Sequence, residues 1–127
     1  MASELRVNTL KDASGNNSIA TSFVAGGSVK SWLNLNGTGT IAARDSFNVS
    51  SLTDNGTGSY TIAFSDSMSN AFYSASGLIA LANDAGSYNP LSVADRTTSN
   101  YRLDCENSSS SNSDPEAVDS QIHGDLA

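Results

Sequence analysis

The chain has 127 residues, a length typical of one domain with a single modest core. Thirteen acidic residues against six basic ones give a formal net charge of −7, which disfavours nucleic acid and anionic membranes as partners because both would be repelled. Only 38% of the residues are hydrophobic and 7% are aromatic, so we expect a thin core.

The first twelve residues, MASELRVNTLKD, lack the charged start and apolar run of a signal peptide, and nowhere do eighteen apolar residues follow one another. We therefore expect a soluble chain made in the cytoplasm. Five Asn-X-Ser/Thr sequons occur, but a chain rich in Asn, Ser and Thr generates them by chance. The single cysteine, Cys105, cannot form an internal disulfide, and we expect a strand residue rather than a reactive thiol.

Residues 1–28 have too few apolar side chains to make a core of their own. Residues 4–10 alternate as a half-buried strand requires, 12–17 read as a turn, and 19–23 as a second extended piece. The Ala-Gly-Gly at 25–27 costs backbone entropy in a strand, so we expect a hinge or linker there. Such an extended arm needs either the following domain or a second copy of the chain to cover it.

The stretch from Ser31 to Phe64 holds three alternating runs separated by two Asn-Gly-Thr-Gly tetrapeptides, and it predicts a β-meander. In the first run, Leu33 and Leu35 share one face of the strand and Trp32 lies on the other. Both tetrapeptides favour hairpin turns, because Asn and Gly tolerate positive φ.

The later runs of the meander predict an apolar cluster. A short strand is expected at 40–43, and Phe47 and Val49 share one side of the strand after it. Ile62 and Phe64 line one face of the returning strand, so we expect the four side chains to pack across one sheet.

The most apolar run, residues 71–82, could be a helix by periodicity, but its serines and the mid-run Gly77 favour a strand with a bulge or bend. Further along, we expect loops at 83–91 and 106–114, the second long and mobile, and strands at 100–105 and 117–123. About eight strands with no convincing helix predict an all-β fold: an antiparallel β-sandwich, jelly-roll-like, over residues 29–127.

No catalytic motif is recognisable in the sequence. The only histidine, His123, is expected at the surface and cannot form a transition-metal site alone. Pairs such as Asp12 with Asn16 could offer oxygens to calcium, but the same residues make tight turns, which we favour. We expect no enzyme, no metal and no cofactor; a glycosidase would need a carboxylate pair, and the sequence singles out none.

The aromatic residues offer the better candidates. Trp32, Tyr73, Tyr88 and Tyr101 are set among Asn, Ser and Thr, a composition typical of surfaces that stack sugar rings and hydrogen-bond hydroxyls. The alternative is that they form the core of an apolar-poor β protein. Of these, Trp32, Tyr88 and Tyr101 are the candidate residues for binding a receptor or partner.

The segment from Lys30 to Gly77 resembles a recurrent module of tailed-bacteriophage virion proteins, mostly tail-fibre or structural proteins. That module runs roughly W-x-N-F-N-G-T-G-T, then R-x-S-x-N-V-S-S-I-T-D-N-G-T-G-x-Y-T-V-x-F, and is matched here by residues 32–39 and 44–64. Upstream, LRVNTLKDASGNNSIA is similar to the leader of such fibre proteins, and the final HGDLA to the terminal strand of the module. Leu35 stands where an aromatic residue is common.

The resemblance implies a non-enzymatic virion structural protein: a homotrimeric fibre or knob, on the tail or the capsid, made in the host cytoplasm. The arm at 1–28 would contact other virion proteins and its own copies, while the knob faces outward toward a host-surface glycan. The alternative is a capsid decoration protein that stabilises the shell without binding a receptor. If the chain has a recognition surface, we expect it on the loops at 83–91 and 106–114.

Overall fold

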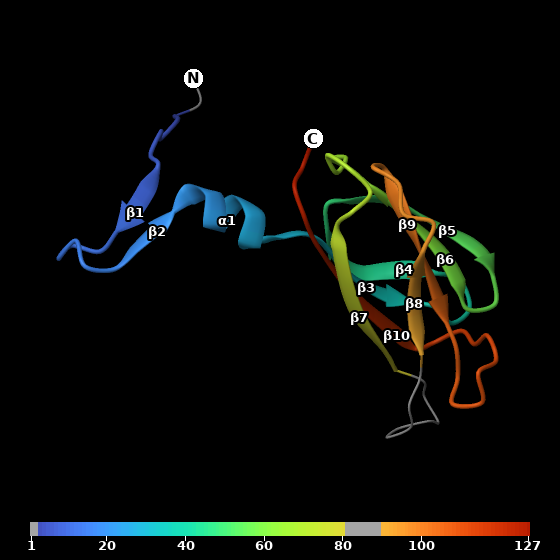
Figure 1. Cartoon of the computed structure of the whole chain (residues 1–127). Helices are drawn as coiled ribbons and strands as arrows, with labels where there is room; N and C mark the ends of the chain where they lie inside the picture. Colours follow the sequence, from blue (N-terminus) through green and yellow to red (C-terminus); the bar gives the residue numbers. More distant parts are fainter. Residues whose placement is uncertain (1–2, 81–89) are drawn as a thin grey trace.

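The computed structural model describes residues 3–80 and 90–127, and these form an antiparallel β-sandwich preceded by a small arm (Figure 1). One sheet, called here the β3 sheet, has the order β4 (Ala42–Phe47), β3 (Val29–Asn36), β10 (Ala117–His123), β7 (Ser74–Ala80). The other, the β6 sheet, has the order β5 (Val49–Gly56), β6 (Ser59–Phe64), β9 (Asn100–Cys105), β8 (Leu91–Ala94). The all-β, antiparallel sandwich expected from the sequence is confirmed.

The core lies between the two sheets and follows from the alternation along each strand. In β3 the side chains of Leu33 and Leu35 are buried, whereas Trp32 points to the other face. Each of β6, β9 and β10 likewise buries every second side chain. The buried hydrophobic set is Leu33, Leu35, Tyr60, Ile62, Phe64, Met68, Tyr73, Tyr101, Leu103, Cys105, Val118 and Ile122.

The expected meander is divided between the two sheets. The chain pairs β4 with β3, then crosses at Asn48, which has φ 55°, and pairs β5 with β6. Val49 lies opposite Phe64 as predicted, but Phe47 lies opposite Trp32 in the other sheet and is 54% exposed. The placement of Phe47 in the core cluster was therefore wrong. The left-handed backbone at Asn48 turns the chain between Phe47 and Val49, so these two residues lie in different sheets.

The two Asn-Gly-Thr-Gly turns lie against one polar cluster. Asp114 Oδ1 accepts a hydrogen bond from the Gly58 backbone N–H at 2.7 Å and one from the Tyr60 hydroxyl at 2.9 Å. The Tyr60 hydroxyl oxygen also lies 3.2 Å from the Gly37 carbonyl, and the Gly37 N–H donates to the Pro115 carbonyl. The segment at 106–114 was expected to be a long mobile loop. At its end, Asp114 and the following Pro115 form hydrogen bonds with both turns.

Other differences concern the ends of elements. The apolar run at 71–82 forms the strand β7 from Ser74 to Ala80, as expected, but its pairing with β10 runs through Gly77 without the bulge that we expected there. Leu91 begins the strand β8 rather than ending a loop. The strands expected at 100–105 and 117–123 are β9 and β10. Residues 83–89 of the expected loop lie outside the described residues.

The arm contains the hairpin of β1 (Thr9–Lys11) and β2 (Ser18–Ala20), followed by the helix α1 (Thr21–Gly27), and projects away from the sandwich in Figure 1. The extended piece expected at 19–23 ends at Ala20, and the expected hinge at 25–27 forms the end of the helix. Of the described residues, those in helical conformation form no segment long and apolar enough to cross a membrane.

Candidate functional site

The outer face of the β3 sheet, turned away from the core, carries an ordered set of aromatic and polar side chains. Strand register aligns Phe47, Trp32, Gln121 and Ser76 as one row across the four strands. The next row contains Asp45, Asn34, Asp119 and Leu78. Because successive residues alternate between faces, these rows are all on the side opposite Leu33 and Leu35. We call these two rows the aromatic face.

Trp32 and Phe47 form the apolar end of the aromatic face. They are direct cross-strand partners on β3 and β4, and their exposed fractions are 37% and 54%. Directly opposite residues on one side of an antiparallel pair lie about 5 Å apart at Cβ, so the two side chains are neighbours on this face. No fold requirement places two large aromatic side chains in solvent, and such surfaces commonly mark binding sites.

Polar groups continue the face beside the rings. The Asn34 side-chain N–H donates to Asp119 Oδ1 at 2.6 Å, which fixes both side chains on the sheet. Next to them lies a hollow of about 340 Å³ lined by Ser76, Gly77, Leu78, Asp119 and Gln121. Gly77 lies between Ser76 and Leu78, and a Cβ there would lie 2.4 Å from the Asp119 carbonyl oxygen and 2.7 Å from Leu91 Cδ2, so only glycine allows the close approach of β7 and β10.

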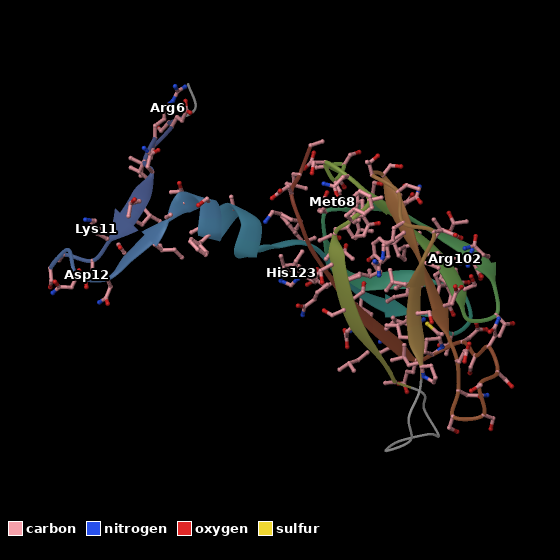
Figure 2. The ribbon with its side chains drawn as sticks, viewed as in Figure 1. Arg6, Lys11, Asp12, Met68, Arg102 and His123 are labelled. Carbon is pink, nitrogen blue, oxygen red and sulfur yellow. The ribbon has the colours of Figure 1, made fainter. Side chains whose placement is uncertain are left out.

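The outer face of the β6 sheet is of a different kind. Its register brings Thr61, Arg102 and Ala94 into one row, with Asp104 in the next. Arg102, labelled in Figure 2, is paired with Asp104 at 3.0 Å and also with Asp95. Of the outward residues described there, none is aromatic. The aromatic face is thus a property of one sheet and not of the sandwich in general.

The three predicted binding residues have different positions. Trp32 is on the aromatic face, and Tyr88 lies outside the described residues. Tyr101 is buried, its hydroxyl 2.9 Å from Ser120 Oγ, and burial raises the pKa of Tyr101 to about 12. Its assignment to a binding surface was therefore wrong. Tyr73 is also buried, and its hydroxyl donates to the Asn100 carbonyl.

Sequence reasoning missed Phe47, Asn34, Asp119 and Gln121 as parts of one surface. The alternation along β3 and β10 already placed Asn34 and Asp119 on the faces opposite their leucines and valines. The missing information was that β3 and β10 are neighbours, although 85 residues separate Asn34 from Asp119. Phe47 could not be found by alternation, because the crossing at Asn48 reverses its face.

Candidate metal ligands do not gather in the described part of the chain. There, no three His, Cys, Asp or Glu side chains lie close enough together to hold a metal ion. Cys105 is buried in β9, as expected of a strand residue, and burial raises the pKa of its thiol to about 12, so the thiol remains protonated at neutral pH. At Asp12, the Asn17 side chain and nearby backbone N–H groups lower the pKa of the carboxyl, and Asp12 caps the β1–β2 turn.

The arm is a second unusual surface, because none of residues 3–28 is buried. Its apolar side chains are exposed, namely Leu5, Val7, Leu10, Ile19, Phe23 and Val24. The Lys30 ammonium group ties the base of the arm to β3: it donates to the carbonyls of Ala25 and Ser28 and to Ser28 Oγ. Beside this junction, Phe47 and Leu126 help to line a hollow of about 620 Å³.

Comparisons with known proteins give no match for this chain among protein-family models, curated proteins or solved structures.

Proposed function

We propose that the chain is a non-enzymatic structural protein of a tailed-bacteriophage particle: a knob, residues 29–127, that is joined to its own copies and to the particle by the arm, residues 1–28. The observation that carries the proposal is an arm with exposed apolar side chains and no core. The sequence resemblance of residues 30–77 to phage virion modules supplies the biological setting.

The arm is too small to be stable by itself in water. The hairpin has strands of three residues each, and α1 has seven residues, no side-chain N-cap hydrogen bond and no buried residue. Isolated helices shorter than about 12 residues and isolated two-stranded hairpins are marginal without packing. Since the sandwich does not cover the arm, the remaining source of packing is another molecule.

The net charge of the arm also differs from that of the knob. Residues 1–28 hold two acidic and two basic side chains, whereas residues 29–127 hold eleven acidic and four basic ones. Knobs of net charge −7 repel each other, while neutral apolar arms do not. The copies are therefore expected to meet through their arms, with the knobs held apart. Three copies are the number implied by the resemblance.

The test is sedimentation equilibrium on the intact chain and on a variant lacking residues 1–28, at micromolar concentration. We expect a trimer for the intact chain and a folded monomer for the truncated one, with the sandwich intact by circular dichroism. A monomeric intact chain would refute arm-mediated assembly. The same result for both chains, trimeric in each case, would place the interface in the knob instead.

The location on the particle is tested by binding. A decoration protein should bind purified capsids and leave host cells unlabelled, whereas a tail fibre or knob should bind cells. Phe23→Asp and Val24→Asp in the arm should abolish attachment to particles if the arm is the anchor. Each change would bury an unpaired charge where an apolar side chain is expected to contact the particle. Unchanged attachment would show that the knob, and not the arm, binds the particle.

A further inference from the structure

We propose that the aromatic face is a binding site for a neutral, hydroxyl-rich glycan, with Trp32 and Phe47 as the stacking platform, Asp119 and Gln121 as the hydrogen-bonding groups, and Asn34 as the residue that positions Asp119. The inference rests on the proposed function in one respect, since it gives the outward knob its ligand. It moves recognition from the loops expected at 83–91 and 106–114 to the surface of a sheet.

The shape of the face suits a chain of sugar rings. The two apolar side chains lie at one end of a row that continues through Gln121 to Ser76, and the hollow of about 340 Å³ begins where Gln121 and Ser76 lie. Sugar rings have an apolar face of C–H groups that covers an aromatic ring, and a rim of hydroxyls that needs polar partners. An apolar platform with fixed polar groups beside it meets both needs.

The polar groups can both donate and accept. Gln121 carries an exposed amide that can do both. The carboxylate of Asp119 accepts from the Asn34 amide nitrogen through one oxygen, leaving the second as a further acceptor, whereas the Asn34 Oδ1 atom is buried and inaccessible to a ligand. The strands fix the backbone at these positions, and the hydrogen bond from Asn34 fixes the carboxylate of Asp119, so little order remains to be acquired there on binding.

Charge selects the kind of glycan. Asp45 and Asp119 both lie in the second row of the face. The cations at its ends are already engaged, Lys30 by the carbonyls of Ala25 and Ser28, and Arg44 by the Asn36 side chain. An anionic polysaccharide would meet two carboxylates on the face itself. The occupant is therefore neutral.

The same charges argue against a second knob as the occupant. In a symmetric pair of faces each residue set meets its own copy across the two-fold axis, so Asp45 and Asp119 would approach carboxylates of the partner. Placing like charges opposite each other across an interface disfavours association. Hydroxyl groups bring no such repulsion.

The experiment is affinity electrophoresis of the intact chain in native gels that contain dextran, mannan, galactan or alginate. We expect retardation in at least one neutral polysaccharide and none in the anionic alginate. Trp32→Ala and Phe47→Ala should each weaken the retardation about two- to tenfold, and Trp32→Phe should restore most of it, because a ring remains to stack. Thermal melting checks that each variant is folded.

The matched control is Phe72→Ala. Phe72 is 94% exposed but precedes β7 instead of lying on the rows of the face, so its removal should change nothing. Equal losses for Phe72→Ala and Trp32→Ala would overturn the proposal, as would retardation by alginate alone or by none of the four polymers. An arm-truncated monomer that still binds dextran, mannan or galactan supports the site even if assembly fails, and a trimer that binds none refutes the site alone.

Discussion

At the scale of single residues, Asn48 explains why the chain forms two sheets instead of one. Its side-chain N–H groups donate to the carbonyls of Lys30 and Asp66, both at 3.0 Å, and its Oδ1 accepts from the Asp66 backbone N–H at 2.6 Å. One side chain thus links the start of β3 to the segment after β6. Asn is among the few residues that adopt a φ of 55° at low cost.

Substitutions at Asn48 should separate these two contributions. Asn48→Gly keeps the left-handed backbone but loses three hydrogen bonds, and we expect a loss of about 2 to 3 kcal/mol in the free energy of unfolding. Asn48→Ala adds the strain of positive φ, about 1 kcal/mol more. Urea unfolding of the two variants measures both values. Equal stabilities would show that the backbone conformation at residue 48 carries no strain.

Residue identities could be predicted where alternation alone decides them. Alternation predicts Trp32 on the face opposite Leu33 and Leu35, and within the strand expected at 100–105 it predicts Tyr101 on the same face as Leu103; the structure confirms both. The alternation therefore already implied that Tyr101 is buried, in conflict with its assignment as a binding residue. Phe47 could not be placed, since its face depends on a backbone turn at the next residue.

At the scale of elements, the repeated Asn-Gly-Thr-Gly shows that one sequence can have different packing at two sites. In the first copy, a Cβ at Gly37 would lie 2.5 Å from Tyr60 Oη, while Gly39 faces open space with φ +66°. In the second copy, a Cβ at Gly58 would lie 2.5 Å from the Cys105 carbonyl oxygen, while Gly56 is open with φ +117°. The crowded glycine is the first in one copy and the second in the other.

Alanine substitutions should therefore rank in opposite order in the two turns. Gly37→Ala and Gly58→Ala should destabilise by about 3 kcal/mol or more, because the contacted atoms belong to the core and to the backbone. Gly39→Ala and Gly56→Ala should cost about 1 to 2 kcal/mol, from strain at positive φ alone. Midpoints of urea unfolding give the ranking. The same order in both turns would contradict the packing described here.

Turn positions were predictable and their partners were not. An Asn-Gly pair predicts a turn from local sequence alone. The hydrogen bonds from Gly58 and Tyr60 to Asp114, however, join positions more than fifty residues apart. The polar composition at 106–114 predicted mobility, although Asn107 accepts hydrogen bonds from the backbone of Ser109 and Ser111. Low hydrophobicity excludes a core, but it does not exclude a hydrogen-bonded loop. The helix α1 was not predicted either, because its sequence has no apolar periodicity.

At the scale of the whole molecule, the neutral arm and the acidic knob give the proposed assembly a definite salt dependence. Knobs repel over about 30 Å at 0.01 M salt but over only about 8 Å at 0.15 M. If apolar arms hold the copies together, added salt should strengthen the trimer, and the dissociation constant from sedimentation should fall. Glu116→Lys replaces an exposed acidic side chain by a basic one and so lowers the negative charge of the knob. The dissociation constant of this variant should depend less on salt. A dissociation constant that rises with salt would indicate ion pairs between the arms.

The position of β10 has a consequence for how the molecule is made. β10 follows every other strand along the chain, yet it lies between β3 and β7 and pairs with both. Until it arrives, the β3–β4 hairpin and β7 have no common partner, and their unpaired edges are open to other chains. The knob therefore folds only after nearly all of it has left the ribosome, through contacts of long sequence separation that form slowly. The interval before β10 pairs is therefore the period of greatest risk of aggregation.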